Sequence, residues 1–104
     1  MLLYNVTVKI DKDIEEEWLQ WIKEKHIPDM MRTGQFTEAR LCHLLDQPED
    51  EESTYVIQYH CENNEKFNRY VNAFSSTIRD EHAKRYKEKF VAFRTLMEII
   101  EIIK

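Results

Sequence analysis

Two of the four histidines in this sequence occupy positions where an imidazole could do chemistry. His82 lies four residues after Ile78 and four residues before Tyr86, so it continues an apolar stripe of helical spacing. A histidine on an inward helix face is partly desolvated, and its pKa can then move across neutrality. It could act as a base, bind haem iron or donate a hydrogen bond to a ligand. The alternative is a buried structural histidine bonded to a backbone carbonyl or to a tyrosine.

The second candidate histidine, His26, precedes the sequence Ile27-Pro28-Asp29. Because Pro28 disfavours helical geometry at the residue before it, we expect the helix to kink here. A side chain at the kink can point into a cleft between helix and sheet, where Asp29 could orient the imidazole. The alternative is a capping role near the carbonyl groups that the kink releases. No spacing of His26, His82 and the cysteines matches a metal site, so no metal is predicted.

A third group of candidates is polar and falls in segments that alternate like strands. Its members are Asn5, Arg40, Gln58 and Arg94, which we expect to share one face of a sheet with Glu38 and Glu98. Two neighbouring arginines can hold a carboxylate or a phosphate group through paired hydrogen bonds. In the alternative interpretation, Arg40 and Arg94 pair with the two glutamates across strands or between subunits and so help to fix the register.

Composition limits the classes of protein to which the chain can belong. Its 104 residues suit one compact domain over 1–104, and a net charge of −5 gives no long-range attraction for nucleic acid or an anionic membrane. A single glycine, Gly34, nearly excludes a phosphate-cradling loop. Cys42 and Cys61 fall in strand-like segments and are expected to be reduced, which, with no visible signal peptide, predicts a cytoplasmic location.

Changes of hydrophobic period divide the chain into the elements that must position these residues. The predicted order is a strand over 2–10, a helix over 12–25 with a further turn over 28–33, a strand over 36–45, a loop over 46–52, a strand over 53–61, a helix from residue 63 or 64, and a strand over 90–103. Gly34 is the expected stop of the first helix. Asn63 or Asn64 should cap the second helix, and Thr77 with Asp80 resembles a capping box that restarts it. An amphipathic helix is the rival interpretation of the last segment.

Aromatic residues follow the inward stripes of both predicted helices. The stripe of the first helix includes Trp18 and Trp21. The stripe of the second helix comprises Phe67, Tyr70, Val71, Phe74 and Ile78. We expect both stripes to pack against the sheet.

The order β-α-β-β-α-β is the ferredoxin-like plan of the α+β class. It predicts a four-stranded antiparallel sheet with two helices on one face. The other face would then expose Phe36, Leu44, Val56 and several residues of the last strand. Apolar patches of that size mark association surfaces, and the simplest closure is a two-fold homodimer that packs sheet against sheet.

Several segments resemble the dimeric α+β barrel superfamily and, more narrowly, a small bacterial family with no established function. They are YNVTV at 4–8, WLQW at 18–21, HIPDM at 26–30, FTEAR at 36–40, QY at 58–59 and HAKRYKEKFVAFRT at 82–95. The resemblance implies a homodimer with facing sheets, polar strand residues at the seam and, in many relatives, a small ligand between the helices and sheet of each subunit. The superfamily includes antibiotic-biosynthesis and haem-degrading monooxygenases, isomerases, dehalogenating enzymes and ligand-sensing domains, so it implies no single reaction.

The haem-degrading members of the superfamily allow a comparison at single residues. They place a histidine on the second helix and an asparagine on the first strand, which resembles His82 and Asn5. They also use a tryptophan on the second helix, whereas Trp18 and Trp21 of this chain fall on the first. This departure argues against haem degradation, and no cofactor is predicted.

These observations predict a homodimer that binds a small, partly apolar molecule between the helices and the sheet, with no nucleic-acid or membrane partner. The walls would come from Trp18, Trp21, Phe67, Tyr70, Phe74 and Tyr86, and the polar contacts from His26, His82, Asn5, Arg40, Gln58 and Arg94. Two alternatives stay open. One is a cofactor-free monooxygenase or isomerase with His82 as the base and His26 as the other catalytic candidate. The other is a structural or interaction protein without catalysis.

Overall fold

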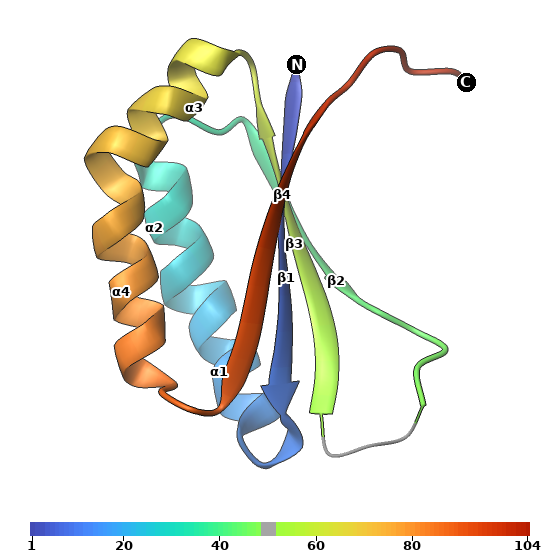
Figure 1. Ribbon diagram of the computed structural model, residues 1–104, viewed down its shortest axis with the longest axis vertical. Coiled ribbons are helices and arrows are strands. Elements are labelled where there is room, and N and C mark those ends of the chain that lie inside the picture. The colour runs from blue at the N-terminus through green and yellow to red at the C-terminus, as the bar shows by residue number, and fades with distance from the viewer. Residues whose placement is uncertain (49–51) are drawn as a thin grey trace.

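The computed structural model describes residues 1–48 and 52–104 and places two helical rods on one side of a four-stranded sheet (Figure 1). The strands are β1 (Leu2–Asp11), β2 (Glu38–His43), β3 (Glu52–Cys61) and β4 (Phe90–Glu98). The first rod comprises η1 (Lys12–Ile14), α1 (Glu15–Trp21), η2 (Ile22–His26) and α2 (Ile27–Arg32). The second rod comprises α3 (Asn64–Tyr70), η3 (Val71–Ser75) and α4 (Ser76–Arg85). Within the described ranges, no helix has the length and apolar character needed to cross a membrane.

The sheet has the strand order β2-β3-β1-β4, and every neighbouring pair is antiparallel. This confirms the ferredoxin-like prediction, with both rods on one face. The last segment is a strand and not a helix, because it pairs with β1 from Ile10–Phe90 to Leu2–Glu98. It ends at Glu98, where the pairing with β1 ends, and not at residue 103 as predicted. The predicted loop over 46–52 includes residues 49–51, which lie outside the described residues.

The first rod continues through Pro28 without the predicted break. Ile27 keeps helical angles, with φ −63° and ψ −45°, and Pro28 lies in the first turn of α2. The residues before it form a π-helical turn, η2, whose wider hydrogen bonding accommodates a residue that has no N–H to donate. The rod ends at the predicted place, where Gly34 takes the left-handed conformation with φ +77°.

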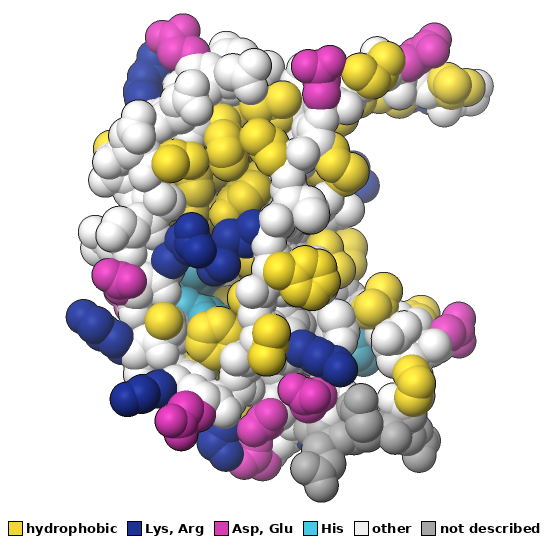
Figure 2. Space-filling model, viewed as in Figure 1, with side chains coloured by type: hydrophobic (Ala, Val, Ile, Leu, Met, Phe, Trp, Pro, Cys, Tyr) yellow, Lys and Arg dark blue, Asp and Glu magenta, His cyan; other side chains and the backbone are white. Residues whose placement is uncertain are grey.

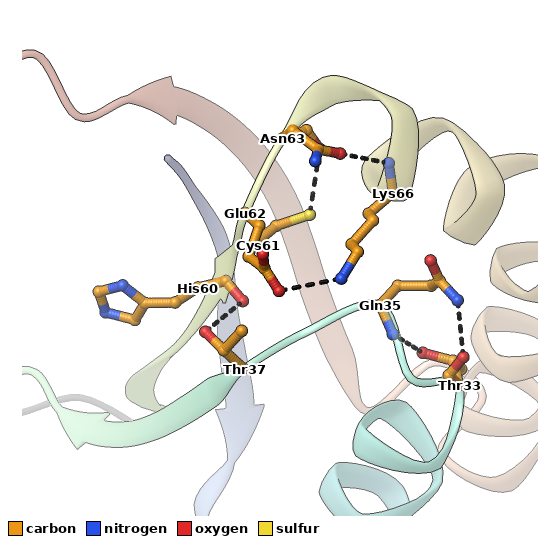
Figure 3. A network of polar contacts seen from close by, with 8 residues as sticks. All are labelled: Thr33, Gln35, Thr37, His60, Cys61, Glu62, Asn63 and Lys66. Carbon is orange, nitrogen blue, oxygen red and sulfur yellow. Dashed lines mark hydrogen bonds and ion pairs between the residues drawn. The ribbon is translucent and has the colours of Figure 1, made fainter.

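Polar contacts fix the rods where α2 ends and α3 begins (Figure 3). Asn63 is the predicted cap, and its Oδ1 accepts a hydrogen bond from the backbone N–H of Lys66 at 2.9 Å. The Lys66 ammonium also donates to Glu62 at 2.9 Å. At the end of the first rod, the backbone N–H of Gln35 donates to the Thr33 hydroxyl at 3.3 Å. The bond from the Lys66 N–H to Asn63 satisfies one of the backbone N–H groups that the start of a helix leaves without a partner.

The predicted restart of the second rod at Thr77 and Asp80 is wrong, because the rod never leaves helical geometry there. A second π-helical turn, η3, occupies this place, and the Ser75 hydroxyl donates to the Val71 carbonyl at 2.8 Å. Val71 is exposed, although its spacing predicted burial. The wide turn changes which side chains face the sheet, and a pattern read at ordinary helical spacing cannot anticipate it.

The core lies between the rods and the sheet. The β1 residues directed toward the rods are Tyr4, Val6, Val8 and Ile10, and they pack with Trp18, Ile22, Met30, Tyr55, Ile57, Tyr59, Cys61, Tyr70 and Tyr86. Phe36 also belongs to this core, which corrects its predicted place on the open face. Its ring centroid lies 5.2 Å from that of Tyr59 and 5.0 Å from that of Tyr70. Phe36 precedes β2, so the alternation of strand residues does not govern its direction.

The opposite face of the sheet, which we call the open face, is uncovered in the single chain. The register places Val91, Phe93 and Met97 of β4 on it, opposite Lys9, Thr7 and Leu3 of β1. Val91 is 61% exposed and Phe93 is 60% exposed. Leu44, just beyond β2, is exposed too, as predicted. The open face therefore presents large apolar side chains to its surroundings.

Candidate functional site

A cavity lies between the two rods and the sheet, beside β4. It is lined by Tyr4, Val6 and Val8 of β1, Ile57 of β3, Ala92 and Arg94 of β4, Ile22, His26 and Met30 of the first rod, and Tyr70, Ile78, Arg79 and His82 of the second. Figure 2 shows basic and histidine side chains next to each other in the hollow between the rods and β4. The void is about 20 Å³ and so has room for about one water molecule.

His82 is the most deeply placed polar residue of the cavity, and it is 5% exposed. The indole Nε1–H of Trp18, on the first rod, donates to His82 Nε2 at 2.9 Å. Because an indole N–H can only donate, Nε2 must carry a lone pair, and the proton of a neutral ring then lies on Nδ1. No other described residue forms a hydrogen bond with this side chain. His82 therefore offers one N–H donor, at Nδ1, and has no free basic nitrogen.

Both histidines of the cavity are neutral near pH 7. Burial lowers the pKa of His82 to about 3, and nearby His26 and the charge of Arg94 lower it further. Burial also lowers the pKa of His26 to about 4, against the opposing effect of Asp29. The two ring centroids are 5.6 Å apart. Protonation of either ring would place a positive charge on a group removed from water and near the charge of Arg94.

Asp29 does not orient the His26 imidazole, although their proximity in sequence suggested it. The two carboxylate oxygens of Asp29 accept hydrogen bonds from Lys25 and Arg32 instead. His26 is the last residue of η2, and its ring contacts Trp21 with 5.3 Å between centroids. The capping alternative also fails, because the His26 side chain makes no capping hydrogen bond at the start of α2.

Two arginines, Arg79 and Arg94, line the outer part of the cavity. Arg79 is exposed on α4, and Arg94 is half-buried on β4. Burial raises the pKa of Tyr4, whereas the positive charges of Arg94 and then Arg79 lower it, so both guanidinium groups act on the same side chain. Arg79 was not among the predicted site residues. Its position three residues before His82, on one helix face, is the signal that could have found it.

The predicted aromatic walls are only partly at the cavity. Tyr70 lines it, whereas Trp21 and Tyr86 pack beside His82, with centroids 5.7 Å and 5.6 Å from its ring. Trp18 is fully buried behind His82 and reaches the site through its hydrogen bond. Most of the wall is aliphatic and comes from Ile22, Met30, Ile57, Ile78 and Ala92, with Val6 and Val8. Phe67 and Phe74 are half-buried and do not line the cavity.

The four polar strand residues do not share one face, which corrects the prediction. Asn5 pairs with Gln58, and Gln58 pairs with Arg40, so these three lie together on the open face. Arg94 pairs with Val6 and therefore faces the rods. Arg40 pairs with Glu38 at 3.4 Å, but both residues belong to β2, so the pair does not run across strands or between subunits as the structural alternative predicted. Among the described residues, Arg94 forms no ion pair with Glu98.

Asn5 is the buried member of the open face, being 9% exposed. Its Nδ2 makes one weak contact, to Met97 Sδ at 4.0 Å, and its Oδ1 has no hydrogen-bond partner among the described residues. Because it lies across the sheet from His82, the two side chains cannot line one cavity within a subunit. The described residues also contain no cluster of three or more His, Cys, Asp or Glu that could hold a metal ion.

The fold is similar to those of several solved structures. A candidate antibiotic biosynthesis monooxygenase from Deinococcus radiodurans is 17% identical with a TM-score of 0.74, and the match covers 100% of this chain and 97% of that one. A dimeric ferredoxin-like protein from an uncultured marine organism is 7% identical with a TM-score of 0.74, covering 98% of both chains. MhuD, in a crystal with two manganese protoporphyrin IX molecules per active site, is 14% identical with a TM-score of 0.69, covering 100% and 99%. At these identities the likeness shows the fold alone.

A match at the level of sequence family covers nearly the whole chain. Residues 1–100 match the domain of unknown function DUF4286. No protein of curated function matches the sequence significantly.

Proposed function

The chain belongs to the DUF4286 family, a domain of unknown function, and from this premise we propose that it is a homodimer that binds a small, partly apolar molecule in the cavity of each subunit. The observation that carries the proposal is the unused donor of His82. The His82 Nδ1–H has no acceptor among the described residues and its ring lines the cavity, so a ligand with an acceptor atom can take this hydrogen bond in place of water. The aliphatic wall offers the remaining contacts.

The open face supports the homodimer. Val91 and Phe93 are largely exposed, and the unpartnered Oδ1 of Asn5 lies on the same face. A second copy packed sheet against sheet would cover these groups and is the simplest closed arrangement. The similar marine protein is itself described as dimeric.

An enzymatic role for His82 receives less support, although one similar structure is a candidate monooxygenase. A general base needs a free lone pair within reach of the proton it removes. The lone pair of His82 Nε2 already accepts from Trp18, so the ring is arranged to donate. A haem site built from His82 and Asn5 is disfavoured as well, because the two residues lie on opposite sides of the sheet.

The test is a melting-temperature screen of small charged and neutral compounds against the wild type and a cavity-filling variant. Ala92→Leu adds bulk at the cavity wall without removing a polar group, and Ala73→Leu makes the same change at an exposed helix position. A compound at 100 times its Kd should add about 2.7 kcal/mol to the stability of the wild type and Ala73→Leu, and nothing to Ala92→Leu. Tryptophan fluorescence should change as well, because the Trp18 indole is hydrogen-bonded to the His82 ring that lines the cavity. The proposal fails if no compound stabilises the wild type.

A further inference from the structure

We infer that the ligand is a small carboxylate monoanion, held by Arg94 and Arg79 at the mouth of the cavity and by the Nδ1–H of His82. This inference rests on the proposed function of the cavity and names the chemical class of its ligand. It assigns the two arginines a role in recognition that the fold does not require of them.

Arg79 and Arg94 differ from the other arginines of the chain in their ion pairing. The chain has six arginines, and the four away from the cavity pair with acids: Arg32 with Asp29, Arg40 with Glu38, Arg69 with Glu65, and Arg85 with Glu17. Within residues 1–48 and 52–104, Arg79 and Arg94 have no carboxylate partner. The sequence has 20 acidic residues, so acids are abundant. The two unpaired guanidinium groups are the two that line the cavity.

The positive charge at the mouth reaches the buried part of the cavity. Arg94 contributes to the lowered pKa of both His82 and His26, after burial, and so its charge acts on both rings. A site with neutral histidines and two arginines that lack an acid partner within the described ranges attracts an anion. An anion bound there would also accept from His82 without needing to protonate it.

The shape of the cavity favours a carboxylate over a phosphate. A guanidinium group forms two parallel hydrogen bonds with a carboxylate or with a phosphate group, so the two arginines select an anion and the space around them must select its class. The void has room for about one water molecule, so the smaller planar carboxylate head group needs less rearrangement of the lining residues than a tetrahedral phosphate does. Arg79 is exposed and free to move outward, which would let an apolar body no larger than a single ring reach Ile78 and Met30.

The test compares benzoate with benzamide, a neutral analogue of the same shape, by calorimetric titration. We expect the wild type to bind benzoate at least tenfold more tightly than benzamide. Arg94→Gln should lose this preference while keeping its affinity for benzamide, and Arg79→Gln should lose part of it. Arg69→Gln, which breaks the ion pair with Glu65 on the outer surface, should behave as the wild type. In ¹⁵N-labelled protein, benzoate should also shift the His82 Nδ1–H resonance, and benzamide should shift it less.

The outcomes separate this inference from the proposed function. Equal binding of benzoate and benzamide, or binding by other screened compounds but by neither of these, overturns the carboxylate while cavity binding stands. Tenfold tighter binding of phenyl phosphate than of benzoate also overturns it, in favour of a phosphate ester. If no compound of any charge binds, both proposals fail. Should Arg94→Gln not fold, Arg94→Lys keeps the charge and loses the paired geometry, and it should lose most of the preference for benzoate.

Discussion

The two faces of the sheet carry similar residue types in opposite surroundings. Val8 faces the rods and is 2% exposed, whereas Val91 on the open face is 61% exposed. Arg94 faces the rods without an acid partner among the described residues, whereas Arg40 on the open face pairs with Glu38. Strand register alone assigns each side chain to its face. The register therefore decides whether a valine or an arginine of this sheet lies against the rods or on the open face, and the chemistry of the side chain does not.

We expect the largest loss of stability from a substitution in the core between the rods and the sheet. Trp18→Ala removes a fully buried ring and the donor to His82, and it should lower the free energy of unfolding by about 3–5 kcal/mol. Trp18→Phe keeps most of the ring and should cost about 1–3 kcal/mol, chiefly through the lost hydrogen bond. Urea denaturation measures both. Equal losses in the two variants would mean that the hydrogen bond contributes little.

On the open face, a charge should separate the subunits without unfolding them. Phe93→Asp places a carboxylate where a partner sheet is expected, and it should weaken the dimer by at least about 2 kcal/mol. Sedimentation velocity should then show a folded monomer. Val71→Asp puts the same charge on an exposed position of the second rod and should leave the dimer intact. A wild type that sediments as a monomer at all concentrations would contradict the proposed assembly.

Acid should lower the free energy of unfolding through the buried His82 and the half-buried His26, which both lie between the rods and the sheet. The folded pKa is about 3 for His82 and about 4 for His26, below the ordinary value of 6.5, so the unfolded chain binds more protons once the pH falls below 6.5. Stability is therefore fully present above pH 6.5 and decreases toward the folded pKa values, by about 1.5 kcal/mol for each histidine between pH 6.5 and 5. Denaturation as a function of pH should show a shallower decrease in His82→Gln. His43→Gln, on β2, is the matched control variant, and an equally shallow decrease there would disprove the assignment to His82.

The smallest expected effect compares the two valines directly. In the Phe93→Asp background, where the open face stays uncovered, Val91→Ala should change the free energy of unfolding by less than about 0.5 kcal/mol. Val8→Ala should cost about 2 kcal/mol in the same background, because Val8 is buried against the rods. Thermal and urea denaturation measure both variants. Equal costs would show that the open face is structured by contacts other than a partner.

The sequence predicted the fold well, because period-two alternation in β1, β3 and β4 and the cap at Asn63 are local signals. It predicted β2 with ends that were too long, since apolar residues such as Phe36 continue a pattern beyond the strand. The π-helical turns left no recognisable signal. Pro28 and the run of small polar residues near Ser75 mark irregular places but do not specify what forms there.

The site was predicted less well than the fold, because its contacts join residues far apart in the chain. The inward position of His82 follows from helical spacing, but its bond to Trp18 spans 64 residues and depends on how the rods pack. Arg94 seemed equivalent to Arg40 until the strand register was known. That Arg79 has no acid partner among the described residues could not be inferred from a sequence rich in acids.

The two π-helical turns have a consequence for rotational phase along the rods. Tyr70 and His82 are twelve positions apart, which in an unbroken α-helix rotates one side chain about 120° away from the other. The turn η3 lies between them and absorbs one residue, so twelve positions act as eleven and the two side chains point in nearly one direction. The turn η2 does the same for Trp18 and Met30, again twelve positions apart. Each rod thus aligns its two buried ends by winding loosely at its middle.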